Sequence, residues 1–290
     1  MTVAEPSRNP ENYCYRHPDR QSFALCQRCT RTICPECQTP AAVGVICPEC
    51  IREQRKSRTP AQRRALRRWG RSGALVASDR PVVTNWIVAI TGAAFLLNLL
   101  LTPLGFGLQP WLAFYAPRLY PQFGSFEPWR LVSVTLVHSG FLHVALNLLS
   151  VWIIGRLLEP TIGRWRFLAL YLISAVGGSV AVALLSFNTP VVGASGALFG
   201  MLGALVVIGR QLGGNVTGVL IILGINLAVG FVFGGISWEA HVGGLIAGLL
   251  VGLIFARTRR ADQFRAQAWL LAGLTAVLLA LLAVPPAILF

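Results

Sequence analysis

Four polar side chains in the apolar part of the chain have the types needed for acyl transfer. Ser195 stands close to glycines in VVGASGALFG, and His241 begins the motif HVGGLIAG. His143 and Asn147 are four residues apart in HVALN, which would place both on one face of a helix. A histidine that takes the serine proton makes the hydroxyl a nucleophile, and N–H donors stabilise the oxyanion that forms. The residue types therefore predict a Ser195–His241 dyad, with His143 and Asn147 as oxyanion donors.

Other proteolytic and transport chemistries lack the residues that they need. Beyond residue 80 the sequence has four carboxylates, all expected at span ends or in loops: Glu127, Glu159, Glu239 and Asp262. An aspartate pair and an H-E-x-x-H zinc motif are absent, and a Ser–Lys dyad is excluded because Lys56 is the single lysine. The lack of buried carboxylates also disfavours proton-coupled transport. Glu239 is two residues from His241 and would face away from it on a helix, so no third member of a triad is expected.

Depth in the membrane supports one shared site. Counted at about 1.5 Å per residue from the arginines expected at the inner boundary, the four polar residues lie roughly 14 to 24 Å above it. Glycines follow both members of the predicted dyad at helical spacing, at 196, 200 and 203 and at 244 and 248. Small residues at such spacing let helix backbones approach closely. Packing alone would explain the glycines, but it would not explain a serine and a histidine at matching depth.

The elements that would position these residues are membrane spans. The chain has 290 residues, of which 54% are hydrophobic and 12% charged, about half the charge of a soluble domain. Seven apolar segments have the length that crosses about 30 Å of hydrocarbon. They cover residues 82–102, 131–155, 167–187, 195–210, 216–234, 238–256 and 268–286. The sequence predicts an all-α polytopic membrane protein, with an aromatic outer segment, 103–130, that lies in the interface.

The distribution of cations predicts the orientation. Nine of the 25 lysines and arginines lie between residues 52 and 71, with one acid among them, just before the first span. The loops that would then be cytoplasmic are also rich in arginine, so the positive-inside rule places the N-terminus in the cytoplasm. No signal peptide opens the chain, and we expect the first span to be an uncleaved anchor. The formal charge of +14 thus indicates contact with a lipid bilayer rather than nucleic acid, in a multi-pass protein of a bacterial plasma membrane.

The first 50 residues hold a different kind of site. Seven cysteines and one histidine form four pairs with two residues between partners: Cys14–His17, Cys26–Cys29, Cys34–Cys37 and Cys47–Cys50. Such pairs point both ligand atoms at one metal, and eight ligands suffice for two tetrahedral zinc ions. Disulfides are the alternative, but thiols stay reduced in a cytoplasmic region. No ligand position is left open, so both ions would be structural; the spacing leaves sequential and interleaved pairing open.

Together, the membrane motifs resemble those of a rhomboid intramembrane serine protease. The likeness is carried by PWRLVSVTLVHSGFLHVALNLLSVW, GASGALFG and AHVGGLIAG, which occur in this order and cover most of residues 82–258. It implies a six-helix core, with the span 268–286 as a seventh helix. It also implies Ser195 as the nucleophile, His241 as the general base and His143 with Asn147 as oxyanion donors, without a cofactor for catalysis.

The resemblance extends to further positions. Trp129 and Arg130 match the W-R pair of the family's first outer loop, and His138 matches a position that lines the polar entry. Phe199 stands where many bacterial members have a tyrosine that packs on the catalytic histidine. We expect Phe199 to keep the ring stacking and the activity, because this chain retains the serine and the histidine that inactive relatives lose.

The cysteine pattern is similar to that of B-box-type zinc fingers, whose knuckles interleave. The resemblance implies one zinc ion on Cys14, His17, Cys34 and Cys37, and the other on Cys26, Cys29, Cys47 and Cys50. The chain would then consist of a zinc-binding module (1–52), a basic linker (53–80) with a helical stretch AQRRALRRW, a rhomboid-like domain (81–258) and a C-terminal helix region (259–290).

The predicted function is that of an intramembrane serine endopeptidase, which cleaves the transmembrane helices of other membrane proteins near their outer ends. Helical backbone hides its carbonyls, so substrates would carry helix breakers such as Gly or Pro near the scissile bond. The alternative is a non-catalytic membrane adaptor that binds transmembrane helices and recruits a protein partner through the zinc module.

Overall fold

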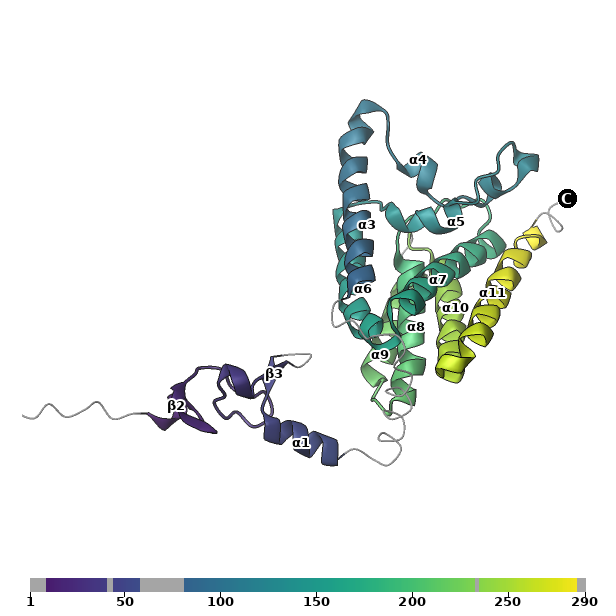
Figure 1. The fold of residues 1–290 in the computed structure, drawn as a ribbon. Helices are drawn as coiled ribbons and strands as arrows, with labels where there is room; N and C mark the ends of the chain where they lie inside the picture. Colours follow the sequence, from purple (N-terminus) through teal and green to yellow (C-terminus); the bar gives the residue numbers. More distant parts are fainter. Residues whose placement is uncertain (1–8, 41–43, 58–80, 233–234, 286–290) are drawn as a thin grey trace, which may run out of the picture. The chain divides into compact units, whose positions relative to one another are not determined.

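The computed structural model describes residues 9–40, 44–57, 81–232 and 235–285. The chain divides into two compact units, Met1–Arg64 and Ala65–Phe290, each with a core of its own (Figure 1). Most of the predicted basic linker, including its expected helix AQRRALRRW, lies outside the described residues.

The first unit is small and is built around its cysteines. Its elements are η1 (Pro10–Asn12), β1 (Tyr13–Cys14), β2 (His17–Gln21), η2 (Pro35–Cys37), β3 (Thr39–Pro40), β4 (Val45–Ile46) and α1 (Pro48–Lys56). The strands pair as two short antiparallel sheets, β1 with β2 and β3 with β4. Six cysteines and Ile33 make up its buried core. A core with so little apolar volume needs further cross-links to stay folded.

The second unit is a bundle of apolar helices, as predicted. They are α3 (Val82–Leu101), α6 (Phe141–Ile162), α7 (Arg164–Leu185), α8 (Ser195–Gln211), α9 (Thr217–Val232), α10 (Trp238–Arg257) and α11 (Phe264–Leu281). Among the described residues, five of them (α3, α6, α7, α10 and α11) are long and apolar enough to cross a membrane, and α8 and α9 are shorter apolar helices. The helices α7, α8 and α10 form the centre, between α3 with α6 on one side and α11 on the other (Figure 1). The second unit is therefore an all-α, multi-pass membrane unit, called the membrane unit below.

The second span begins later than predicted. Hydropathy predicts this span at 131–155, but residues 130–136 form the short helices α5 (Arg130–Ser133) and η6 (Val134–Leu136), and the long helix starts only at Phe141. The backbone is extended at Val137 and Gly140. His138 therefore lies in this break and outside the span, contrary to the prediction. There Gln109 donates to its carbonyl at 2.7 Å and the Ala194 amide to its Nε2 at 3.4 Å.

The segment between the first two spans folds as a chain of short helices. They are η3 (Thr102–Leu104), α4 (Gln109–Leu112), η4 (Ala116–Leu119) and η5 (Pro121–Phe123), followed by α5. Arg130 is 2% exposed and ties them together. Its guanidinium pairs with Glu127 and donates to the carbonyls of Ala113 at 2.5 Å and Pro110 at 2.6 Å. Trp129 donates to the Trp111 carbonyl at 3.2 Å, so the W-R pair fixes this segment.

A buried carboxylate attaches α3 to α6. Glu159 was expected at a span end or in a loop, and the structure places it within the last two turns of α6, 2% exposed. It accepts hydrogen bonds from the amides of Val83 at 2.9 Å and Thr84 at 2.8 Å, and from the Thr84 hydroxyl at 2.7 Å. These amides belong to the first turn of α3 and have no partner within their own helix. The negative charge also suits the positive end of the helix dipole.

Glycines bring α8 and α10 into backbone contact. A Cβ atom at Gly244 would collide with the carbonyl of Gly196, and one at Gly248 would collide with that of Gly200. The predicted close approach of the fourth and sixth spans is therefore present, and only glycine fits at these two positions of α10.

The extra helix α11 is held at both ends. On α11, the amide group of Gln267 accepts from Arg166 at 2.8 Å and donates to the Thr258 carbonyl at 2.9 Å. At the other end, the Tyr120 hydroxyl donates to the Leu282 carbonyl at 2.8 Å. These bonds join α11 to α7, to the end of α10 and to the segment between the first two spans.

Candidate active site and metal clusters

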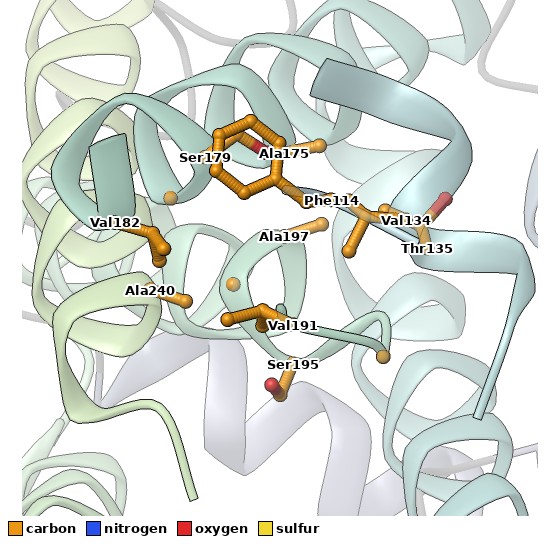
Figure 2. A pocket seen from close by; sticks show the side chains of 13 residues that line it. Phe114, Val134, Thr135, Ala175, Ser179, Val182, Val191, Ser195, Ala197 and Ala240 are labelled. Atoms are coloured by element: carbon orange, nitrogen blue, oxygen red, sulfur yellow. The ribbon is translucent and has the colours of Figure 1, made fainter. Parts of the chain in front are cut away.

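Ser195 is the first residue of α8 and follows a constrained loop. Gly193 has a φ of +120°, which disfavours any residue with a side chain. Its amide donates to the Val134 carbonyl at 3.0 Å, and Val191 pairs with Phe114 in a short bridge. Ser195 is half-buried and lies at the wall of a cavity of about 20 Å³, room for about one water molecule. In Figure 2 its hydroxyl points away from the other labelled side chains of the cavity.

His241 lies in the first turn of α10 and is 7% exposed. Its ring stacks on Phe199 with a centroid distance of 4.1 Å and an angle of 12° between the planes. Phe199 is four residues after Ser195, so both lie on the same face of α8, one turn apart. The stacking therefore brings the imidazole to α8 one turn from Ser195, and the backbones of Gly196 and Gly244 lie in contact.

Two features set the surroundings of His241. Among the described residues, its Nδ1 atom has no hydrogen-bond partner. A Cβ atom at Gly230 of α9 would lie 3.4 Å from this nitrogen, so α9 borders the imidazole. Glu239 accepts from the hydroxyls of Ser186 and Ser237 instead of pairing with the histidine. Glu239 is thus engaged by two serine hydroxyls in the described part of the chain, and the Ser195–His241 dyad stays a prediction.

His143 and Asn147 lie one turn apart on α6, and His143 lies near the loop that leads to Ser195. A Cβ atom at Gly193 would lie 2.8 Å from Nε2 of His143, so this nitrogen faces the loop backbone. The other nitrogen, Nδ1, lies 3.0 Å from the Ser139 hydroxyl. Asn147 donates to the His143 carbonyl at 2.9 Å, and its side-chain oxygen has no partner in the described part of the chain. His138 packs edge-on against His143, with ring centroids 5.0 Å apart.

Three further groups shape this site that were not predicted from the sequence. Gly193 is needed both for its backbone conformation and for the approach of His143. Its place in GASG was a usable signal, since glycine next to a nucleophile commonly marks a backbone that other residues cannot adopt. The Ser139 hydroxyl orients His143, and the Val134 carbonyl holds Gly193. Val134 and Ser139 both lie before the start of α6 at Phe141, in the part of the predicted span that is not a long helix, which hydropathy does not reveal.

In the first unit, the eight predicted ligands gather in two clusters. Within each cluster the ligand atoms lie within 4.8 Å of one another, and the grouping is interleaved: Cys14, His17, Cys34 and Cys37; Cys26, Cys29, Cys47 and Cys50. Nδ1 of His17 lies 3.3 Å from the Cys34 sulfur and 3.5 Å from that of Cys37. Each cluster could hold one metal ion.

The sulfurs also have the electrostatic surroundings of metal ligands. The Cys47 amide donates to the Cys26 sulfur at 3.3 Å, and the Cys50 amide to the Cys47 sulfur at 3.4 Å. Burial would raise the pKa of Cys26, but backbone amides, that of Cys47 foremost, lower it to about 6. Burial and the neighbouring sulfurs raise the pKa of Cys50. Four sulfurs this close can all be thiolates only beside a cation, and soft sulfur and imidazole ligands suit zinc.

The family match found among known proteins falls in the membrane unit, the second of the two units. Residues 125–258 match the family model "Rhomboid domain". This range includes Ser195, His241, His143 and Asn147, and it lies wholly within the second unit. The cysteine unit lies outside the match, so its likeness to a B-box stays a prediction.

Similar proteins come from bacteria, plants and a parasite. Over 130 residues the chain is 39% identical to "Rhomboid protease GluP" of Bacillus subtilis, covering 42% of this chain and 25% of that protein. It is 40% identical to "RHOMBOID-like protein 5" of Arabidopsis thaliana over 138 residues, 44% of either chain. It is 33% identical to "Rhomboid-like protease 5" of Toxoplasma gondii over 172 residues, 52% of this chain and 20% of that one. The chain thus spans less than half of the length of each of these relatives. Because they come from different kinds of organism, they do not show that the membrane is bacterial. The matches support the rhomboid family, and residues 125–258 of the second unit are the part that resembles its domain.

Proposed function

We propose that the protein is an intramembrane serine endopeptidase with Ser195 as nucleophile and His241 as general base. The observation that carries this proposal is the stacking of His241 on Phe199, one helical turn from the serine. The backbone contact between α8 and α10 keeps this geometry fixed. A histidine held this way needs no carboxylate to orient it, because the ring stacking takes that role.

The reaction would proceed by acyl transfer. His241 takes the proton of the Ser195 hydroxyl while the oxygen attacks a peptide carbonyl. The Ser195 amide at the free N-terminus of α8, Nε2 of His143 and an N–H of Asn147 would stabilise the oxyanion. His241 then gives the proton to the leaving amine. A water molecule, deprotonated by His241, finally cleaves the ester and restores the serine.

We infer that the substrates are single transmembrane helices of other membrane proteins, cleaved near the outer membrane surface. The site lies at the end of α8 nearest the segment 102–130, the outer side if the N-terminus is cytoplasmic. Helical carbonyls are already hydrogen-bonded, so the substrate must unwind locally. Glycine or proline near the scissile bond makes this easier.

A reporter assay tests the proposal. A tagged single-span protein with Gly and Pro at its outer helix end is incubated with the purified protein in vesicles of phosphatidylglycerol and phosphatidylethanolamine. The wild type is expected to release a fragment cut at the outer end. Ser195→Ala and His241→Ala should lose cleavage by at least about a thousandfold, as dyad members do. The matched control Ser150→Ala, a half-buried serine on α6, should cleave like the wild type.

A second candidate is an adaptor that binds transmembrane helices without cleaving them and recruits a partner through the cysteine unit. The presence of a separate unit outside the rhomboid domain favours it. The two candidates differ in the same assay. An adaptor would bind the reporter and leave it intact, in the wild type as in Ser195→Ala.

We also propose that the cysteine unit, residues 1–52, binds two structural zinc ions in the interleaved clusters and lies in the cytoplasm. Eight sulfur and nitrogen ligands, without a carboxylate or a free position, support structural zinc. Metal analysis of the full chain is expected to give two zinc ions per protein. One ion or none would contradict the proposal, and Cys34→Ser and Cys47→Ser should each lose about one.

A further inference from the structure

A groove opens beside α3, away from the serine and histidine. It has a volume of about 430 Å³ and an almost wholly apolar lining. Ile87, Ile90 and Thr91 of α3 form one wall, and Leu168, Tyr171 and Leu172 of α7 form the other. Residues of α5 and η6, with Trp129 before them, close the end nearest the segment 102–130. The groove exists because α3 packs chiefly on α6, where Glu159 holds its first turn, and much less on α7.

The position and chemistry of the groove define its occupant. Its walls are two membrane-spanning helices, so it opens onto the hydrocarbon of the bilayer. The exposed surface of the lining is almost wholly apolar, and the hydroxyls of Thr91 and Tyr171 are buried in the walls, so water finds few partners in this space. Leaving it empty would be costly for a space of this size. The volume is that of a small-molecule site. A flexible hydrocarbon chain fits these conditions.

A partner helix fits less well. Each wall offers residues of a single helical turn, at spacings of three and four. Helices that pack stably in membranes contact each other over several turns. Trp129 is 51% exposed at the end of the groove, where an indole suits the boundary between lipid chains and headgroups.

We propose that this groove binds one acyl chain of a membrane lipid, from the leaflet on the side of the segment 102–130. The bound chain would support the short helix η6. Thr135 of η6 lines both the groove and the cavity beside Ser195. The carbonyl of its neighbour Val134 accepts from the Gly193 amide at 3.0 Å. The lipid thereby helps to hold the loop that precedes Ser195.

Photo-crosslinking tests the binding. The full-length protein is placed in nanodiscs of phosphatidylglycerol whose acyl chains carry a diazirine. Leu172→Trp fills the groove, and Leu184→Trp is a matched control on the same helix, since the two leucines are 36% and 37% exposed and Leu184 does not line the groove. Ile90→Trp fills the groove from α3, in case the first variant folds poorly. Wild type and Leu184→Trp are expected to crosslink several-fold more at 87–91 and 168–172 than at other lipid-facing residues. Both groove-filling variants should lose this excess.

Two results would overturn the proposal. They are equal crosslinking over all lipid-facing residues, and an excess that survives both groove-filling variants. The link to Ser195 has its own readout in the wild type. Delipidation should speed hydrogen exchange of the Gly193 amide several-fold, and phosphatidylglycerol should reverse this; unchanged exchange would refute the link. None of these measurements depends on proteolysis. Their outcome is therefore independent of whether the protein is a protease.

Discussion

Two helix contacts in the membrane unit are stabilised in different ways. Between α8 and α10, glycines let one backbone rest against the other over two turns, and no added atom fits. Between α3 and α6, one buried carboxylate takes three hydrogen bonds at the end of the helix, and α3 is otherwise largely exposed. The proposed dyad lies at the first contact, where its geometry is fixed. The groove lies beside the second, where a helix is anchored at one end.

The largest effect is expected from adding a methyl group between α8 and α10. In Gly244→Ala the new Cβ atom collides with the Gly196 carbonyl, which cannot move without shifting a helix. We expect a loss of about 3 kcal/mol or more in the free energy of unfolding, at the upper end for overpacked cores. Denaturant unfolding in detergent micelles measures it. The control Gly273→Ala on α11 has no atom within 4 Å of the new Cβ and should be neutral or slightly stabilising. Equal stability of both variants would show that the contact is not tight.

Removing the carboxylate of Glu159 should lower the free energy of unfolding by a smaller amount, and its effect should be local. Glu159→Ala leaves the amides of Val83 and Thr84 without an acceptor, and we expect a loss of about 2 kcal/mol. Hydrogen exchange should speed up in the first turn of α3 and stay slow in α8 and α10. Asp262→Ala is the control, because its ion pair with Arg260 is exposed and contributes little. If Glu159→Ala has the same free energy of unfolding as Asp262→Ala, the hydrogen bonds of Glu159 to α3 do not stabilise the protein.

The stacked ring should affect activity more than stability. Phe199→Leu keeps an apolar side chain but removes the face on which His241 rests. We expect a fall of about tenfold in kcat/KM, or 1.4 kcal/mol, with about 1 kcal/mol lost in unfolding. Phe199→Tyr should cleave the reporter like the wild type. Full activity in the leucine variant would mean that another group positions the histidine.

The smallest effect concerns pH and the segment 102–130. Burial would raise the pKa of Glu127, but the guanidinium of Arg130 and then that of Arg118 outweigh it and lower the pKa below its usual value of 4.5. The pair therefore adds stability that is complete above pH 4.5 and is lost as the pH falls through the lowered pKa. At pH 7, Glu127→Gln should unfold about 1 kcal/mol more easily than the wild type. The difference should shrink towards pH 3, and a constant difference would contradict the assignment.

Much of the membrane unit is readable from sequence because lipid imposes simple rules. Apolar runs of the right length predict helices, and polar residues such as Ser195 and His241 stand out against them. Glycine spacing also predicts the contact of the fourth and sixth spans correctly. The spacing of the eight candidate metal ligands predicted metal clusters, and the structure gathers these residues in two groups, although the spacing had left their grouping open.

Other features depend on contacts that hydropathy cannot report. Residues 131–140 are apolar like a span, yet they form short helices and an extended turn, so His138 was misplaced. Glu159 bonds to Thr84, which lies 75 residues earlier in the sequence, and no residue near Glu159 indicates this partner. The groove arises from an uneven contact of α3 with its two neighbours, which no linear pattern encodes.

The most direct test of the central claim is covalent labelling of the serine. A fluorophosphonate reacts with a serine hydroxyl only where a base activates it, and intact-mass and peptide analysis locate the adduct. We predict one adduct per chain, on Ser195, that is present in Ser150→Ala and absent in Ser195→Ala and His241→Ala. An unlabelled wild type, or labelling of Ser195 that persists without His241, would contradict the dyad.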